Sequence, residues 1–137
     1  MFIDVGANVG QTLLDYCAAA SGAGYLGFEP NPLCSSHLAS IIEKNTLEDC
    51  RVIPAGLSDA NGVAELLLED LGDAEPAATM ISDLRPGRIY RSVLICCLRF
   101  DDLAASIVNG PIALMKIDVE GAELLALRGM KRTLREQ

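Results

Sequence analysis

The stretch Met1-Phe2-Ile3-Asp4-Val5-Gly6-Ala7-Asn8-Val9-Gly10 decides the fold that we predict for this chain. A short apolar run ends in a loop of small residues, and a helical pattern follows directly. Open α/β sheets build nucleotide pockets from this order of strand, glycine turn and helix. Gly6 tolerates backbone angles that other residues avoid, and Asn8 accepts a left-handed conformation unusually well. Gly10 allows close packing where the helix begins, and the free N–H groups of that helix point toward a ligand.

The glycine loop has the spacing Gly-x-Asn-x-Gly, whereas dinucleotide-binding enzymes favour Gly-x-Gly-x-x-Gly. The carboxylate of Asp4, at the end of the predicted strand, suits a cationic group such as the ammonium of an amino acid. Taken alone, the loop is also compatible with a strand-to-helix turn that binds nothing.

Length and charge narrow the class of protein. The 137 residues suit one domain, and half of them are apolar. A net charge of −8 argues against binding to nucleic acid or to an acidic membrane surface. No apolar run approaches the roughly 20 residues of a membrane span, and no signal region precedes the first strand, so we expect a cytoplasmic protein.

Cysteine and histidine spacing predicts no metal site. The five cysteines include no Cys-x-x-Cys pair and no histidine at ligand spacing. We interpret them as buried free thiols in a reducing compartment. His37 is the only histidine, and its place within a predicted helix favours a surface or packing role.

Hydrophobic periodicity predicts strands that alternate with helices. After the first strand we expect strands at 25–28, 51–54, 63–68, 93–98 and 112–118. We expect helices at 11–20 and 33–44, a short helix that begins near 100, and a helix after 119. Asp101 is the predicted cap of the helix that begins near 100. The alternation implies an α/β fold with a mostly parallel sheet. Residues 72–92 show no period and are interpreted as a substrate loop or lid.

Three predicted strands end in acids, Asp4, Glu29 and Asp118. Ligands of open α/β sheets collect outside the carboxyl ends of the strands, so the three carboxylates should share one rim. Glu29 follows the second strand, where an acid accepts hydrogen bonds from ribose hydroxyls. The alternative for Glu29 is a solvated carboxylate that assists the following helix.

Four motifs then connect these residues to a known family. They are Phe2-Ile3-Asp4-Val5-Gly6-Ala7-Asn8-Val9-Gly10-Gln11-Thr12, Gly27-Phe28-Glu29-Pro30-Asn31-Pro32, Gly56-Leu57-Ser58-Asp59, and Leu114-Met115-Lys116-Ile117-Asp118-Val119-Glu120-Gly121-Ala122-Glu123, the last followed by Leu127-Arg128-Gly129. In this order they resemble the FkbM family of S-adenosylmethionine-dependent methyltransferases. The last motif is the most specific of the four.

The resemblance implies a class I methyltransferase fold, which is Rossmann-like, with helices on both faces of the sheet. It also implies methyl transfer to a hydroxyl oxygen of a small-molecule or carbohydrate acceptor, such as a sugar, glycolipid or natural product. The cofactor would be S-adenosylmethionine. By the same resemblance, the cofactor-binding residues would be Asp4, Gly6, Ala7, Asn8, Gly10, Glu29, Pro30, Asn31, Ser58 and Asp59.

Asp118 and Glu120 are the candidate catalytic residues, since the resemblance implies that they stand near the methyl group and the acceptor. An alcohol acceptor must lose a proton, and a carboxylate at the rim can take it. The sequence does not choose between the two acids. Each also has a structural alternative, Asp118 as a helix cap and Glu120 as a favourable charge at the start of that helix.

The chain departs from the family in length. Class I methyltransferases have further strands after the helix that follows Asp118, and this sequence ends at Gln137. We therefore expect residues 1–137 to form a partial domain that looks C-terminally truncated, either a fragment or a homo-oligomer that covers the open sheet edge. A non-catalytic α/β module for nucleotide binding or assembly is the second hypothesis. A nicotinamide-dependent oxidoreductase is the third, disfavoured by the glycine spacing.

Overall fold

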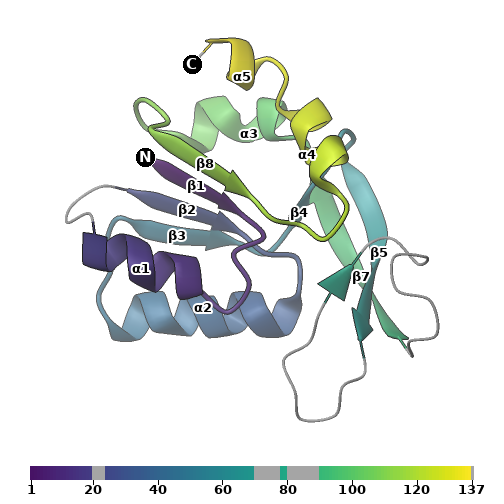
Figure 1. Ribbon diagram of the computed structural model, residues 1–137, viewed down its shortest axis with the longest axis horizontal. Coiled ribbons are helices and arrows are strands. Elements are labelled where there is room, and N and C mark those ends of the chain that lie inside the picture. Colours follow the sequence, from purple (N-terminus) through teal and green to yellow (C-terminus); the bar gives the residue numbers. More distant parts are fainter. Residues whose placement is uncertain (20–23, 70–77, 80–89, 137) are drawn as a thin grey trace.

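The computed structural model describes residues 1–19, 24–69, 78–79 and 90–136. Its main layer is a four-stranded parallel sheet in the order β3-β2-β1-β8. The strands are β1 (Phe2–Val5), β2 (Tyr25–Phe28), β3 (Cys50–Ile53) and β8 (Leu114–Ile117). Helices α1 (Gln11–Ala19) and α2 (Pro32–Lys44) cover one face, and α3 (Phe100–Ile107) lies on the other (Figure 1). The predicted α/β fold with helices on both faces is confirmed.

Alternation of side chains along β1 builds two cores. Ile3 and Val5 join the cluster on the α3 side, where the rings of Phe28 and Phe100 meet edge to face with centroids 5.9 Å apart. Phe2 faces the α1 side and packs against the aromatic rings of Tyr16 and Tyr25. Successive side chains of a strand point to opposite faces, so a short apolar strand between two helical layers contributes to both cores.

The second sheet corrects the predicted alternation of strands and helices. It has the order β4-β7-β5-β6, with β4 (Gly56–Leu57), β5 (Gly62–Glu69), β6 (Ala78–Thr79) and β7 (Tyr90–Leu98). Strand β5 pairs antiparallel with both β6 and β7, and β4 pairs parallel with β7. The predicted alternation was wrong here, since β3, β4 and β5 follow one another without a helix between them. Apolar alternation marks a strand without showing the direction of its partner.

Most of the predicted loop or lid at 72–92 lies outside the described residues. The described parts of that range are β6 and the first residues of β7, which begins at Tyr90 instead of the predicted 93. The strand predicted at 63–68 runs from Gly62 to Glu69.

Strand β8 occupies an edge of the parallel sheet, although its apolar sequence is typical of a buried strand. It begins at Leu114, which is 59 % exposed, and its other residues are half-buried. The edge position explains the exposure, because no described strand pairs with the outer side of β8. The homo-oligomer expected to cover this edge stays a prediction.

The histidine follows its prediction, but two of the five cysteines do not, since Cys17 is only half-buried and another is exposed. Cys34, Cys50 and Cys97 are buried free thiols, whereas Cys96 is exposed on β7. Alternation along the strand explains the difference between the two adjacent cysteines. His37 lies exposed on α2, which confirms a surface position.

The C-terminal helices pack on the α3 side through a carboxylate. Contrary to the prediction, Asp101 does not cap its own helix; it accepts hydrogen bonds from the backbone N–H groups of Arg132 and Thr133 (both 2.9 Å) and from the Thr133 hydroxyl (2.8 Å). Thr133 begins α5 (Thr133–Glu136), which follows α4 (Glu123–Gly129). Asp101 therefore caps a helix that is distant in the sequence.

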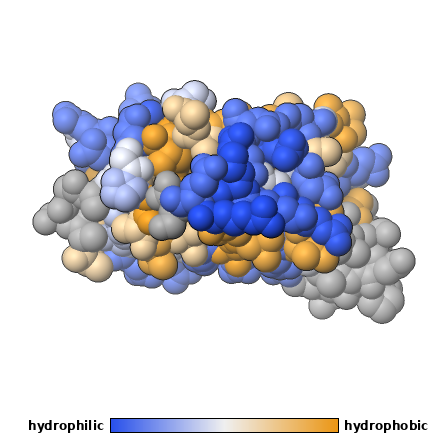
Figure 2. All heavy atoms as spheres, turned by 90° about the horizontal axis from the view of Figure 1, so that it is seen from above, coloured by the Kyte–Doolittle hydropathy of each residue, from blue (hydrophilic) through white to orange (hydrophobic). Residues whose placement is uncertain are grey.

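The surface on the α5 side is mostly hydrophilic, with apolar patches among the hydrophilic residues (Figure 2). The exposed large apolar side chains of β8, α4 and α5 are Leu114, Leu124, Leu127 and Leu134. Among the helices in the described ranges, none combines the length and apolar character that crossing a bilayer requires.

Gly6 follows β1 in a turn where two backbone segments approach closely. Its φ is +84°, and its N–H donates to the carbonyl of Phe28 at the end of β2 (2.9 Å). On the other side, the N–H of Asp118 donates to the carbonyl of Val5 (2.9 Å). A Cβ at Gly6 would collide with the carbonyl oxygen of Asp118. The turn therefore requires glycine both for its backbone angle and for space.

We predict that Gly6→Ala destabilises the fold more than Gly110→Ala does. Gly110 has a similar φ of +90°, but a Cβ added there would meet nothing within 4 Å, so its substitution costs only the left-handed strain of about 1–2 kcal/mol. Gly6→Ala adds overpacking of about 1–3 kcal/mol. Urea unfolding measures both free energies, and equal losses would show that the Asp118 carbonyl moves aside freely.

We also predict that Asp101→Ala lowers the free energy of unfolding by about 2 kcal/mol at neutral pH, because the buried N–H groups lose a charged acceptor. Burial alone would raise the pKa of Asp101, but the hydrogen bonds from Thr133 and Arg132 outweigh it and hold the pKa below the usual 3.8. The stabilisation is thus complete above that value and is lost as the pH falls through the lower folded-state value. Asp102→Ala, at an exposed position, is the control; a loss independent of pH would contradict the role of the charge.

Candidate functional site

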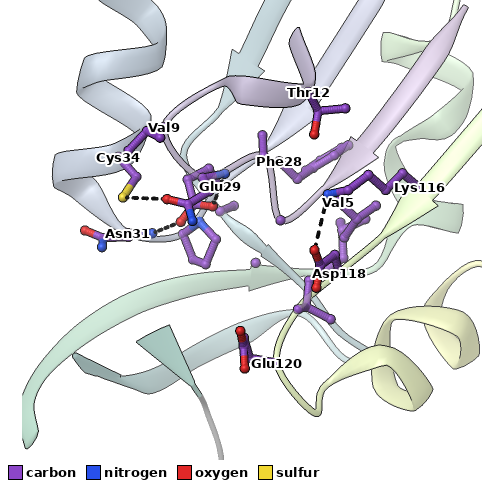
Figure 3. Close-up of a pocket in the computed structure, with 18 of the residues that line it drawn as sticks. Val5, Val9, Thr12, Phe28, Glu29, Asn31, Cys34, Lys116, Asp118 and Glu120 are labelled. Atoms are coloured by element: carbon purple, nitrogen blue, oxygen red, sulfur yellow. Dashed lines mark hydrogen bonds and ion pairs between the residues drawn. The ribbon is translucent and has the colours of Figure 1, made fainter. Parts of the chain in front are cut away.

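A cavity of about 340 Å³ lies at the carboxyl ends of β1, β2 and β8 (Figure 3). The second sheet contributes its far wall through Gly56, Leu57 and Leu66. Its volume falls within the roughly 300–1,000 Å³ of small-molecule sites. The predicted site residues that line it are Gly6, Ala7, Asn8, Glu29, Pro30, Asn31, Asp118 and Glu120.

The loop after β1 forms one wall of the cavity. Asn8 adopts the left-handed conformation predicted for it, with φ of 48°. Its backbone N–H donates to Glu29 Oε2 (2.8 Å), and its side-chain Oδ1 accepts from the thiol of Cys34 on α2 (3.4 Å). The left-handed turn thereby ties the glycine loop to the segment that follows β2.

Glu29 is the central acid of the cavity. The residue is 6 % exposed, and its second oxygen, Oε1, accepts from the N–H of Asn31 (2.8 Å). Burial raises the pKa of Glu29 above its usual value, although the N–H groups of Asn31 and Asn8 oppose the rise. A carboxylate offers about four acceptor positions, and these two contacts use one on each oxygen. Further donors from a ligand can therefore bind the same carboxylate.

Asn31 connects the cavity wall to α2. Its Oδ1 accepts from the N–H of Leu33 (3.1 Å), so the residue caps the helix. Its Nδ2 is buried and has no hydrogen-bond partner among the described residues. Pro30 and Asn31 both line the cavity, and Asn31 is only 1 % exposed.

The two candidate catalytic acids lie on the loop between β8 and α4 (Figure 3). The Asp118 side chain is 67 % exposed, and its Oδ2 lies 3.6 Å from Lys116 Nζ. Glu120 is exposed and has a left-handed φ of 50°. The Glu123 carboxylate supports this loop by accepting from the N–H groups of Val119 (3.3 Å) and Gly121 (3.2 Å). The pKa of Glu123 lies below its usual value, because its carboxylate accepts hydrogen bonds from backbone N–H groups. The largest contributions come from the N–H of Glu123 itself and then from that of Gly121.

Asp4 does not line the cavity, contrary to the prediction that it faces a ligand. It is fully buried within β1, where its Oδ2 accepts from the Tyr25 hydroxyl (2.7 Å) and its Oδ1 pairs with Lys116 Nζ (3.2 Å). Burial, together with this hydrogen bond, raises the pKa of Tyr25 well above its usual value. Strand alternation places Asp4 on the same face as Phe2 and turns it toward the α1 side of the sheet.

Three further residues of the predicted cofactor set lie outside the cavity lining: Gly10, Ser58 and Asp59. Gly10 has a φ of +92° and brings the start of α1 against Leu38 of α2, which confirms its predicted packing role. The carbonyl of Ser58 packs so closely against α4 that a Cβ at Gly129 would collide with it. Ser58 thus joins the second sheet to the C-terminal helices.

The sequence did not indicate several lining residues. Gln11, Thr12 and Asp15 reach the cavity from the first turns of α1, Cys34 reaches it from α2, and Leu66 reaches it from β5. Thr12 and Asp15 are three residues apart and therefore lie on one face of α1, and this spacing of two polar residues was the available signal. Leu66 had no such signal, because the sequence does not reveal the antiparallel pairing of its strand.

The cavity is acidic. Its described lining contains the carboxylates of Asp15, Glu29, Asp118 and Glu120, and Lys116 is the one cationic side chain among them. This charge distribution favours a ligand that carries positive charge and opposes a pyrophosphate.

Comparison with known families identifies the family of the chain. The Methyltransferase FkbM domain matches residues 4–137, which is nearly the whole chain. Neither a curated protein nor a solved structure shows significant similarity to the chain. The match extends from the strand that holds Asp4 to the end of the sequence and includes every residue that lines the cavity. The chain belongs to the FkbM methyltransferase family.

Proposed function

We propose that this protein is an S-adenosylmethionine-dependent methyltransferase that methylates a hydroxyl oxygen. The observation that carries the proposal is the buried Glu29 carboxylate, held at the cavity between the glycine loop and α2. Membership of the FkbM family supports methyl transfer in general. The acceptor class is a hydroxylated sugar, glycolipid or natural product, as the family resemblance implies.

The lining residues fit the proposed cofactor. Glu29 retains acceptor capacity for two ribose hydroxyls, and Pro30 and Asn31 lie beside it for the nucleoside. The loop of Gly6, Ala7 and Asn8 would face the methionine part. When bound, S-adenosylmethionine supplies a methyl group on a positively charged sulfur. The four carboxylates of the lining, against the single ammonium of Lys116, suit that charge, whereas they would repel the pyrophosphate of a nicotinamide cofactor.

The loop after β8 carries the residues proposed to remove the proton of the acceptor hydroxyl. An alcohol becomes a better nucleophile as it loses its proton, and a carboxylate at the cavity can accept that proton. We assign this role to Asp118, because its carboxylate lines the cavity directly after the carboxyl end of β8. Glu120 lies on the same loop and contributes negative charge at the acceptor side.

Glu29→Ala should weaken the binding of S-adenosylhomocysteine by about 1.5–3 kcal/mol, because the ribose hydroxyls lose a charged acceptor. Isothermal titration calorimetry measures the change. Glu65→Ala is the matched control, since Glu65 is exposed on β5 and does not line the cavity. Unchanged affinity in a folded Glu29→Ala protein would remove the ribose assignment.

Asp118→Asn should lower kcat by about 10²–10⁴-fold while leaving cofactor affinity close to that of the wild type, because general-base catalysis contributes an effect of this size. Glu120→Gln should lower kcat less, since it removes charge and not the base. Transfer of a labelled methyl group to a panel of hydroxylated acceptors measures both. The reverse ranking of the two variants would assign the base to Glu120.

A further inference from the structure

Lys116 contacts acids on both sides, and the proposed chemistry does not assign it a role. It lies on β8 directly opposite Asp4 on β1 in the parallel register. Its Nζ is 3.2 Å from Asp4 Oδ1 and 3.6 Å from Asp118 Oδ2. The lysine side chain is 34 % exposed and lines the cavity, so its ammonium connects the sheet interior to the catalytic loop.

Two side-chain contacts hold the buried end of this arrangement. Asp4 is fully buried, and its other oxygen accepts from the Tyr25 hydroxyl at 2.7 Å. A buried carboxylate requires a charged partner, and removing that partner leaves its charge uncompensated. Asp4 therefore keeps the Lys116 ammonium at the floor of the cavity.

At the exposed end of this arrangement, the Asp118 carboxylate needs a partner that holds its orientation. The Asp118 side chain is 67 % exposed on the loop after β8. Glu120, two residues further along the same loop, has a left-handed backbone conformation. An exposed carboxylate without an anchor samples several rotamers, whereas a base must be held in reach of the proton that it removes. Lysine suits the task because its compact charge can attract two carboxylates that lie in different directions.

We propose that Lys116 is a positioning residue, which uses the buried charge of Asp4 to hold the Asp118 carboxylate toward the cavity. This inference rests on the proposed function for its catalytic consequence. The rival role for the ammonium is direct binding of the carboxylate in the methionine part of the cofactor, since Lys116 is the cation among the described lining residues.

Kinetics of Lys116→Met, Asp118→Asn and the double variant test the proposal, with the acceptor that the wild type methylates fastest. Misplacing the base should lower kcat of Lys116→Met by about 10–100-fold. Its affinity for S-adenosylhomocysteine should change by less than about threefold, a small effect for a residue that does not bind the ligand. Because Lys116 acts through Asp118, the double variant should be no slower than Asp118→Asn.

Two kinetic results would overturn the proposal. Loss of S-adenosylhomocysteine affinity in proportion to kcat would make Lys116 a cofactor ligand, and losses that multiply in the double variant would make it independent of Asp118. Tyr25→Phe controls for damage to the buried network, since Tyr25 contacts Asp4 but does not line the cavity. Tyr25→Phe should lower Tm with little change in kcat. If it lowers kcat as much as Lys116→Met does, the effect of Lys116 on catalysis is only structural.

Crystal structures of the wild type and Lys116→Met give a readout that needs neither acceptor nor cofactor. The Asp118 carboxylate should keep one orientation in the wild type and lose it in the variant. An unchanged orientation overturns the positioning role even if the wild type binds S-adenosylhomocysteine. A wild type that fails to bind S-adenosylhomocysteine refutes the proposed function, while the orientation of Asp118 still decides what Lys116 does.

Discussion

The close approach of the Gly6 backbone to the Asp118 carbonyl is the constraint on which the site depends. Strands β1 and β8 are far apart in the sequence and pair in parallel, so their following loops emerge side by side. Only a residue without a side chain lets these loops meet at that distance. The same turn donates its N–H to Phe28 and thereby fixes the loop after β1 against the end of β2. The cavity wall is thus a product of backbone contacts more than of side-chain packing.

The acids at the strand ends divide into different roles because of where each strand stops. Asp4 is still within the pleat and turns into the sheet, where Tyr25 and Lys116 satisfy it. Glu29 stands one residue beyond β2, where the N–H groups of two loops converge on it. Asp118 stands one residue beyond β8 and reaches solvent. Relative to the strand end, Asp4 lies two residues earlier than Glu29 and Asp118, and this difference separates a buried structural carboxylate from two carboxylates that line the cavity.

Periodicity and motif order predicted the α/β fold, the parallel core sheet, the left-handed Asn8 and the central place of Glu29. They did not predict that Asp4 would be buried, because the identity of its partner, Tyr25, depends on the register between β1 and β2. The antiparallel pairing of β5 and β7 also escaped prediction, since alternation in one strand carries no information on the direction of its neighbour. Asp101 was expected to cap its own helix, and its real partners, Arg132 and Thr133, lie about thirty positions further along the chain.

The position of Leu66 has a consequence for how this protein can diversify. One side of the cavity is built by the parallel sheet and its loops, whereas Leu66 enters from β5 of the separate antiparallel sheet. Exchanging this leucine for a smaller or larger apolar residue alters the room in the cavity and leaves the hydrogen bonds at Glu29 intact. The two walls can accumulate changes independently, so substitutions in β5 reshape the cavity without rebuilding the half that surrounds Glu29.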